Sequence, residues 1–167
     1  MEIKTCINDE MIQEVAQLAE TIWKTCYVGI ITEEQATYMI EKFQSFPVIK
    51  NAINQEQYTY FGAYENDQMV GYCGVQIQNK RLFLSKLYLL DSSRGKGIGL
   101  RLLNHAIQFG KDHKMDTIYL TVNKQNEHGI SIYQRSGFKT IDAVRSDIGH
   151  GYIMDDYIME RNICIDK

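Results

Sequence analysis

The chain has 167 residues and a net charge of −3, with 44% hydrophobic and 23% charged residues. These values predict one globular domain over residues 1–167 with a buried core, and the absence of Lys or Arg blocks argues against a nucleic-acid-binding protein. No apolar stretch approaches the length of a membrane span, so no membrane partner is expected. The first residues lack a basic segment followed by an apolar one, and the four cysteines are scattered. We therefore expect a cytoplasmic protein with reduced thiols and no metal site.

The first third of the chain predicts a strand followed by two helices. Residues 2–7 form the strand, and Asp9 is placed to cap the first helix. The apolar stripe of that helix comprises Met11, Val15, Leu18 and Ile22. Thr32 and Gln35 have the spacing of a capping box and open the second helix. Residues 46–57 are less regular, and no element is predicted there.

The middle of the chain predicts an antiparallel meander of three strands. Two strands at residues 58–64 and 69–77 flank a turn at 65–68, and a second turn at 78–80 leads to a third strand at 82–90. The third strand is rich in Leu, Phe and Tyr and is apolar on both faces toward its end. This pattern is typical of a strand that is covered on both sides.

A glycine-rich turn follows this strand, with the sequence Arg94-Gly95-Lys96-Gly97-Ile98-Gly99. Glycines let the backbone turn sharply and bring its N–H groups close to a ligand, and a helix that begins here adds unpaired N–H groups and its positive dipole end. Such a site suits a phosphate or pyrophosphate, although the same glycines also serve simply to turn a chain. A Walker loop is absent, and Gly99 comes one residue too early for the dinucleotide fingerprint.

The last third predicts a helix from Ile98 to about Lys111 and a strand at 117–122 that lies parallel to the strand at 82–90. Asn126 caps a short helix that ends near Ser136, with Gly137 at its C-cap.

A closing hairpin of residues 138–143 and 152–160 surrounds a loop at 147–151. The order is β-α-α-β-β-β-α-β-α-β-β. It predicts an α/β (α+β) fold with one mixed, mostly antiparallel sheet of about seven strands and helices on both faces.

Two motifs and this order of elements resemble the GNAT superfamily of N-acetyltransferases over nearly the whole chain. The Arg-x-x-Gly-x-Gly spacing of Arg94, Gly97 and Gly99 is similar to the family's acyl-CoA pyrophosphate loop. The block Asn126-x-x-Gly129-x-x-x-Tyr133-x-x-x-Gly137-Phe138 resembles the segment after the fifth strand, where Ala is commoner than Gly at position 129. The C-terminal segment looks like that of small bacterial members, and the chain is more loosely similar to bacterial polyamine acetyltransferases.

The resemblance implies acetyl-CoA as the co-substrate, with no metal. The pyrophosphate would be held by Arg94, Gly95, Lys96, Gly97, Ile98 and Gly99. The pantetheine arm would lie along the backbone of Leu87, Tyr88 and Leu89, which would also polarise the thioester carbonyl. Asn126 would contact the cofactor arm, with a plain helix cap as an equal alternative.

Acetyl transfer also needs an acid for the thiolate and a base for the amine. The resemblance makes Tyr133 the general acid, because a phenol with a pKa of about 10 stays protonated beside a thiol with a pKa of about 8.5; packing is its alternative role. No carboxylate precedes Asp91 on the strand at 82–90, and neither Ser85 nor Lys86 can easily serve as the base. Proton removal through water, or by an acid from elsewhere in the chain, is left open. Asp155 and Asp156 are candidates on opposite faces of the last strand, with an exposed edge as the favoured interpretation.

In the family, the acceptor lies between the first two helices and the closing hairpin. The candidate acceptor residues are Trp23, Tyr27, Glu33, Glu34 and Tyr38. Aromatic rings with acids suit a cationic amine, although Glu33 and Glu34 would also complement a helix dipole.

These observations predict an acetyl-CoA-dependent N-acetyltransferase that acts on a primary amine, with a small amine or polyamine favoured and a protein amine as another option. The enzyme would act as a monomer or homodimer, without nucleic-acid or membrane partners. The alternatives are a non-catalytic acyl-CoA-binding module of the same fold and, less well supported, a nucleotide-binding enzyme.

Overall fold

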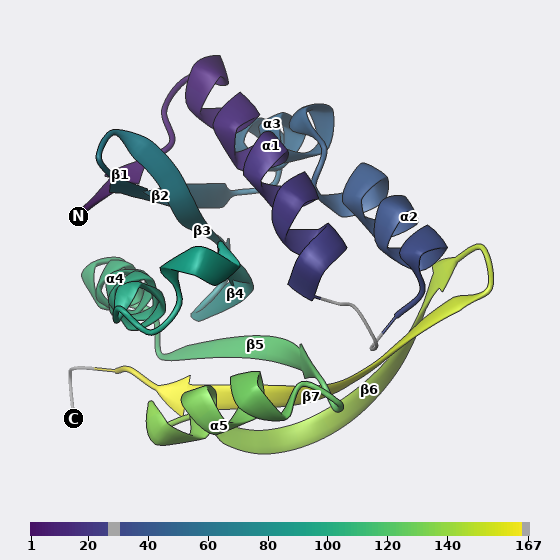
Figure 1. The fold of residues 1–167 in the computed structure, drawn as a ribbon. Helices are drawn as coiled ribbons and strands as arrows, with labels where there is room; N and C mark the ends of the chain where they lie inside the picture. The colour runs from purple at the N-terminus through teal and green to yellow at the C-terminus, as the bar shows by residue number, and fades with distance from the viewer. Residues whose placement is uncertain (27–30, 165–167) are drawn as a thin grey trace. The chain divides into compact units, whose positions relative to one another are not determined.

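The computed structural model describes residues 1–26 and 31–164, and its strands form a seven-stranded mixed sheet in the order β1-β2-β3-β4-β5-β7-β6 (Figure 1). The first elements are β1 (Glu2–Thr5), α1 (Asp9–Cys26), α2 (Glu33–Phe43), α3 (Phe46–Gln55), β2 (Tyr58–Glu65) and β3 (Gln68–Gln78). They are followed by β4 (Arg81–Leu89), the 3-10 helix η1 (Asp91–Ser93), α4 (Ile98–Asp112), β5 (Thr117–Asn123), α5 (Glu127–Arg135), β6 (Lys139–Gly149) and β7 (Tyr152–Asn162). The predicted mixed sheet of about seven strands is confirmed.

The chain divides into two compact units, which are described separately. The first unit contains Met1–Ile77 and Leu84–Ala106, and the second contains Gln78–Phe83 and Ile107–Lys167. Both β4 and α4 contribute residues to each unit. The prediction of a single domain over residues 1–167 therefore stays a prediction.

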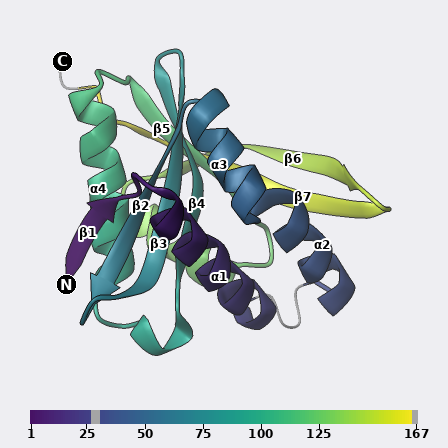
Figure 2. The ribbon, with the colours of Figure 1, turned by 90° about the horizontal axis from the view of Figure 1, so that it is seen from above.

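In the first unit, helices cover both faces of the antiparallel strands β2 and β3. Neighbouring residues of a strand point to opposite faces, and Tyr60 and Phe61 of β2 are both buried. The Phe61 ring lies 4.5 Å from the ring of His105 in α4, whereas Tyr60 stacks on Tyr72 of β3. Figure 2 shows α1, α2 and α3 on one side of these strands and the first part of α4 on the other. The burial of apolar side chains on both faces stabilises this unit.

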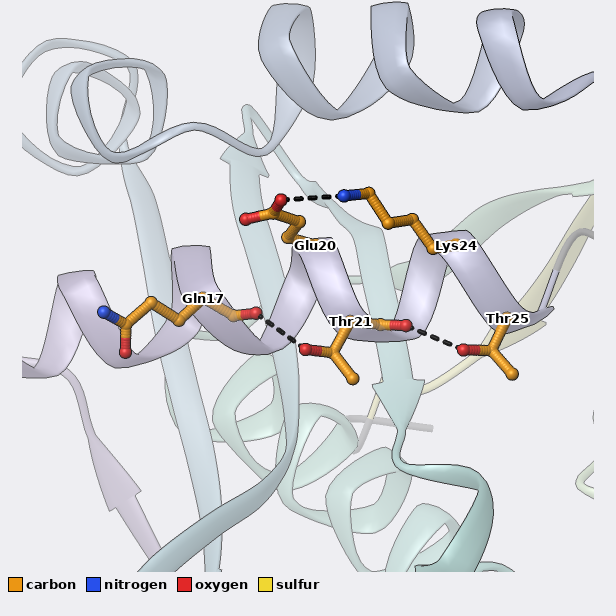
Figure 3. Close-up of polar contacts among 5 residues, drawn as sticks. All are labelled: Gln17, Glu20, Thr21, Lys24 and Thr25. Atoms are coloured by element: carbon orange, nitrogen blue, oxygen red, sulfur yellow. Dashed lines mark hydrogen bonds and ion pairs between the residues drawn. The ribbon is translucent and has the colours of Figure 1, made fainter.

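Helix α1 has one buried and one exposed side. Trp23 is buried, with its ring centroid 5.5 Å from that of Tyr88 on β4. On the exposed side, Lys24 and Glu20 form an ion pair at 2.9 Å, and Thr21 and Thr25 each donate a hydrogen bond to the carbonyl oxygen four residues earlier (Figure 3). These polar groups are paired within the helix, as is usual for a solvated helix surface.

Helix α3 is missing from the predicted order. Pro47 lies in its first turn, where an N–H has no partner within a helix, and its φ suits a helix start. Ile49 and Ala52, three residues apart, are buried. Because a helix of this length gains most of its stability from tertiary packing, the local pattern was too weak to predict it.

The predicted helix caps are confirmed with one correction. Thr32 Oγ1 accepts a hydrogen bond from Gln35 N–H at 3.0 Å, as predicted for α2. At the start of α1, the cap is Asn8 rather than Asp9, since Asn8 Oδ1 accepts a hydrogen bond from Met11 N–H at 2.9 Å. Asp9 instead contributes negative charge to the first turn.

In the second unit, β5 pairs in parallel with Arg81–Phe83 of β4, which confirms the predicted crossover, and β7 pairs with both β5 and β6. The closing hairpin is longer than predicted. Gly149 pairs with Tyr152 around a turn in which His150 and Gly151 both have positive φ. A two-residue turn of this kind matches the twist of paired strands, so the residues predicted as a loop at 147–151 mostly continue the hairpin.

Candidate active site

The glycine loop connects η1 to α4 in the first unit, and its three glycines have different structural roles. Gly95 and Gly97 both have φ +80°, and a Cβ added at either would meet no atom within 4 Å. Glycine is therefore needed there for its backbone conformation, not because of crowding. At Gly99, a Cβ would lie 3.2 Å from Leu89 Cδ1, so this glycine lets α4 pack closely against β4.

Helix α4 begins directly after this loop, with Arg101 N–H donating to Gly97 O at 3.1 Å. The N–H groups of the first turn, at Ile98 and Gly99, precede the first residue that can pair within the helix. Together with the positive end of the helix dipole, they make an anion site that the open space at Gly97 leaves accessible.

The two cations of the loop are exposed and loosely paired. Arg94 Nε lies 3.7 Å from Asp91 Oδ1, and Lys96 Nζ lies 3.7 Å from Glu65 Oε1. Exposed pairs at this distance contribute little to stability. Both side chains can therefore reorient toward an anion without a large loss of folding free energy.

The backbone of β4 has amide groups on the edge that faces away from β3. Leu90 N–H donates to Val70 O of β3 at 2.8 Å, and the carbonyl oxygen of Tyr88 lies against Gly71 of the same strand. Because successive residues of a strand direct their amides to opposite edges, the N–H groups of Leu87 and Leu89 point away from β3. An extended, peptide-like ligand could pair with such an edge.

Lys86 of β4 lies among aromatic side chains. Its Nζ is 5.2 Å from the ring centroid of Tyr58 and 5.7 Å from that of Tyr60, and it lies 3.2 Å from Ser85 Oγ, which also accepts a hydrogen bond from Tyr58 Oη. Burial lowers the pKa of Lys86 to about 8, partly offset by Glu56. The sequence did not reveal this, because the pattern of β4 alone does not show how far a lysine is desolvated.

In the second unit, Asn126 caps α5. Its Oδ1 accepts a hydrogen bond from Gly129 N–H at 3.0 Å, which confirms the cap. A Cβ at position 129 would lie 2.7 Å from Asn126 Nδ2. The glycine that departs from the family pattern therefore lets the cap fold tightly over the helix start. A contact from Asn126 to the cofactor arm stays a prediction.

Tyr133 lies on α5 and is half-buried, in a helix with no fully buried residue among its described positions. Its ring makes an edge contact with the buried Phe138, with centroids 5.8 Å apart. The C-cap geometry is as predicted, because Gly137 has φ +92°. Tyr133 thus packs against Phe138 without being a core residue.

Asp155 and Asp156 lie on β7, which is an internal strand between β5 and β6, so the interpretation of an exposed edge is wrong. Asp155 forms an ion pair with Lys124 at 3.0 Å. Asp155 and Asp156 are both half-buried, and the Oδ1 atom of each is buried without a hydrogen-bond partner in the described structure. Burial, and secondly Asp155, raise the pKa of Asp156 to about 6.

Acidic and aromatic side chains surround a hollow of about 400 Å³ on α2. Its lining residues are Glu33, Glu34, Thr37, Tyr38 and Glu41. Lys42 already lies over the Tyr38 ring, 5.5 Å from its centroid, which shows that this ring accepts a cation. Of the other predicted acceptor residues, Trp23 is buried against Tyr88, and Tyr27 lies outside the described residues.

Residues 1–26 and 31–164 contain neither a metal-binding cluster nor a membrane-spanning helix. Within that part of the chain, no group of three or more His, Cys, Asp or Glu side chains is arranged to hold a metal ion. The helices described there include none long and apolar enough to cross a membrane.

Comparison with known proteins relates the chain to acetyltransferases. The model of the Acetyltransferase (GNAT) family matches residues 16–138. The spermidine N(1)-acetyltransferase of Thermoplasma acidophilum is 30% identical over 145 residues, which cover 84% of this chain and 90% of that protein. The N-alpha-acetyltransferase 50 of Danio rerio is 32% identical over 106 residues, which cover 60% of this chain and 63% of that protein.

The fold also matches a solved structure. The crystal structure of PaiA N-acetyltransferase from Thermoplasma acidophilum in complex with coenzyme A has a TM-score of 0.81 and 26% identity. The match covers 97% of this chain and 99% of that chain. The predicted fold class is confirmed by this likeness.

Proposed function

Because the chain belongs to the acetyltransferase (GNAT) family, we propose that it transfers an acetyl group from acetyl-CoA to a small primary amine, with polyamines as the first candidates. The family confirms the predicted enzyme class. The acceptor and the roles of individual residues are the proposed part.

The geometry of the glycine loop is the main support for acetyl-CoA as the acetyl donor. The positive φ of Gly95 and Gly97, the open space beside them and the start of α4 together suit a pyrophosphate. Arg94 and Lys96 would add charge from their exposed positions. The complex of a protein of similar fold with coenzyme A supports this assignment.

The edge of β4 would hold the rest of the donor. The pantetheine arm would pair with the outward amide groups of Leu87 and Leu89 in the manner of an added strand, with Tyr88 between them. An N–H of this edge would also polarise the thioester carbonyl, which stabilises the negative charge that develops on its oxygen during attack.

Tyr133 would act as the general acid. The amine nitrogen forms a bond to the thioester carbon, the carbon–sulfur bond breaks, and the departing thiolate takes the phenol proton of Tyr133. The half-buried position of this side chain supports the role, since a tyrosine that served only packing would be expected in the core.

The hollow on α2 supports a cationic acceptor. Glu33, Glu34 and Glu41 bring three carboxylates to one helix face, with Tyr38 between them. A polyamine offers several ammonium groups to such a surface, and the related protein from Thermoplasma acidophilum is named for spermidine. Trp23 is not among the residues that line this hollow and would act indirectly, through its contact with Tyr88 of β4.

We place the reaction in the cytoplasm, where acetyl-CoA is available. Cys6 and Cys73 are buried free thiols, and burial with Glu14 nearby raises the pKa of Cys6 to about 12, so this thiol is unreactive. The enzyme would act as a monomer or homodimer without nucleic-acid or membrane partners.

Mass spectrometry of an amine panel incubated with the protein and acetyl-CoA tests the proposal, together with a CoA-binding isotherm. We expect acetylated spermidine or spermine and saturable CoA binding. CoA binding without any acetylated product would favour the non-catalytic module. Acetylation confined to uncharged or anionic acceptors would contradict the proposal of a polyamine acceptor. It would not contradict the proposal that acetyl-CoA is the donor.

A further inference from the structure

We propose that Lys86 of β4 is a site of self-acetylation, where the protein transfers an acetyl group from its own bound acetyl-CoA to the side-chain amine. This inference rests on the acetyltransferase function proposed above, and its acceptor is part of the chain instead of a free amine. Lys86 directly precedes Leu87, whose outward N–H belongs to the edge that we assign to the donor. The residues that carry the inference all lie in the first compact unit.

The amine of Lys86 has lost contact with water without gaining a negative partner. Its Nζ faces the rings of Tyr58 and Tyr60, at 5.2 and 5.7 Å from their centroids, and forms a hydrogen bond of 3.2 Å with the neutral Ser85 Oγ. Among the described residues, no carboxylate forms an ion pair with Lys86. Burial lowers its pKa to about 8, which Glu56 only partly offsets. A desolvated lysine of this kind is partly neutral near neutral pH and is therefore a nucleophile.

The edge of β4 assigned to the donor lies within reach of this amine. Consecutive residues of a strand are about 3.3 Å apart along it, and a lysine carries its amine on a flexible four-carbon stem. In the structure, the Lys86 amine lies toward β2, where the hydrogen bond to Ser85 holds it. One neutral hydrogen bond at a half-buried site is a weak restraint, so the stem can turn toward a thioester bound at Leu87.

The transfer to Lys86 needs no reactant other than acetyl-CoA. The lone pair of the neutral Nζ forms a bond to the thioester carbon, and the carbon–sulfur bond breaks with its electrons staying on sulfur. The nitrogen then loses a proton, and the thiolate takes one up through water. The products are an acetylated lysine and free CoA thiol.

Tyr60 of β2 has an unused hydrogen-bond donor on the side of the sheet that Lys86 occupies. The residue is only 1% exposed, and its Oη is buried without a hydrogen-bond partner in the described structure, which is unusual for a hydroxyl. Its ring lies across Gly74, the residue opposite it on β3, where a Cβ would be 3.0 Å from Tyr60 Cζ. The hydroxyl therefore extends toward β4, on the other side of β3. Burial raises the pKa of Tyr60, so the hydroxyl keeps its proton.

An acetylated Lys86 would give these polar atoms matching partners. The new amide oxygen would accept a hydrogen bond from the Tyr60 hydroxyl, and the amide N–H would donate to Ser85 Oγ in place of the ammonium. Acetylation would also remove a charge from a half-buried position. The unpartnered hydroxyl and the desolvated amine thus have a common explanation.

Peptide mapping by mass spectrometry tests the inference, after incubation of the full chain with acetyl-CoA that carries a deuterated acetyl group. The deuterium separates new acetyl groups from any that are present at purification. We expect Lys86 to be labelled about 10²-fold faster than the exposed Lys80 in the same digest, because far more of it is neutral amine. The rate per molecule should not depend on protein concentration, since donor and acceptor belong to one molecule. Gly97→Asp, which should not hold the donor, should lose the labelling.

The role of Tyr60 has its own measurement. Acetylation should raise the Tm of the wild type, and by less in Tyr60→Phe, which keeps the ring and lacks the hydroxyl. An equal rise in both proteins would overturn this role.

Two results would overturn the self-acetylation itself: no label at Lys86, or equal labelling of Lys86 in Gly97→Asp and the wild type, which would mean unassisted chemical reactivity. A CoA-binding isotherm on the same protein separates this failure from that of the proposed function. Missing label with saturable CoA binding overturns only the inference about Lys86. Missing label without CoA binding overturns the assignment of the donor as well.

Discussion

The glycine loop and the outer face of α2 differ in which atoms they present to a ligand. In the loop, glycine conformations and the start of α4 present backbone N–H groups, and the charged side chains are loosely paired. On α2, the backbone is occupied by helical hydrogen bonds, and only side chains such as Glu34 and Tyr38 line the hollow. A site made of backbone depends on chain geometry, whereas a site made of side chains can change specificity by single substitutions. Donor binding should therefore be sensitive to glycine replacement, and acceptor binding to charge.

The largest effect is expected for Gly97→Asp. The new residue must adopt φ +80° and places a carboxylate in the open space beside the proposed pyrophosphate. Strain and like-charge repulsion together should weaken acetyl-CoA binding by on the order of 10³-fold. A CoA-binding isotherm measures this, and thermal unfolding checks the fold. Gly97→Ala, which adds strain without charge, should lose less of the affinity for CoA. Equal affinity of Gly97→Asp and the wild type would contradict the assignment of the loop to the pyrophosphate.

Tyr133→Phe should lower turnover by about 10²-fold, at the lower end of the range for general acid catalysis, because a thiolate is a good leaving group. Acetyl-CoA affinity should stay the same, since the phenol acts only on the departing sulfur. Steady-state kinetics with an amine that the wild-type protein acetylates measures turnover, and a CoA-binding isotherm measures the affinity. Tyr64→Phe, which removes a hydroxyl bonded to Glu14, is the control. Unchanged turnover would mean that Tyr133 only packs against Phe138.

On the acceptor side, Glu33→Gln combined with Glu34→Gln should raise the KM for a polyamine about fivefold, because exposed charge pairs each contribute less than about 1 kcal/mol. The KM for acetyl-CoA should not change, and the effect should diminish with added salt. Glu10→Gln, also in a helix first turn, controls for the helix dipole. A double variant with the wild-type polyamine KM would show that these carboxylates only complement the dipole of α2.

The smallest expected effect is a pH dependence of stability that arises from Lys86. This side chain lies on β4, the strand whose backbone would bind the donor. Because its pKa is lowered to about 8 in the folded protein, the unfolded chain binds more protons between about pH 8 and 10.5. The free energy of unfolding should therefore rise across this window by about 1 kcal/mol, since the half-buried site is partly solvated. Denaturant unfolding should show a smaller rise in the free energy of unfolding for Lys86→Met. The exposed control Lys96→Met should show the same rise as the wild type.

Several features followed from the sequence because they depend on local chemistry. The left-handed conformations at Gly97 and Gly137 require glycine, and the caps by Thr32 and Asn126 require a side-chain oxygen next to a helix start. The parallel pairing of β4 and β5 followed from the helical crossover that connects them. The roles of these residues toward acetyl-CoA and the acceptor stay predictions.

Other features arise only from long-range packing. Helix α3 forms because Ile49 and Ala52 are buried, and β7 is internal because β6 pairs outside it. Desolvation is likewise a tertiary property, so neither the lowered pKa of Lys86 nor the raised pKa of Asp156 is visible in the sequence. The sequence by itself determined the glycine loop and the order of the elements other than α3, since backbone sterics and side-chain periodicity act over a few residues. The tertiary structure decided which charged groups lose contact with water, because that depends on neighbours distant in the chain.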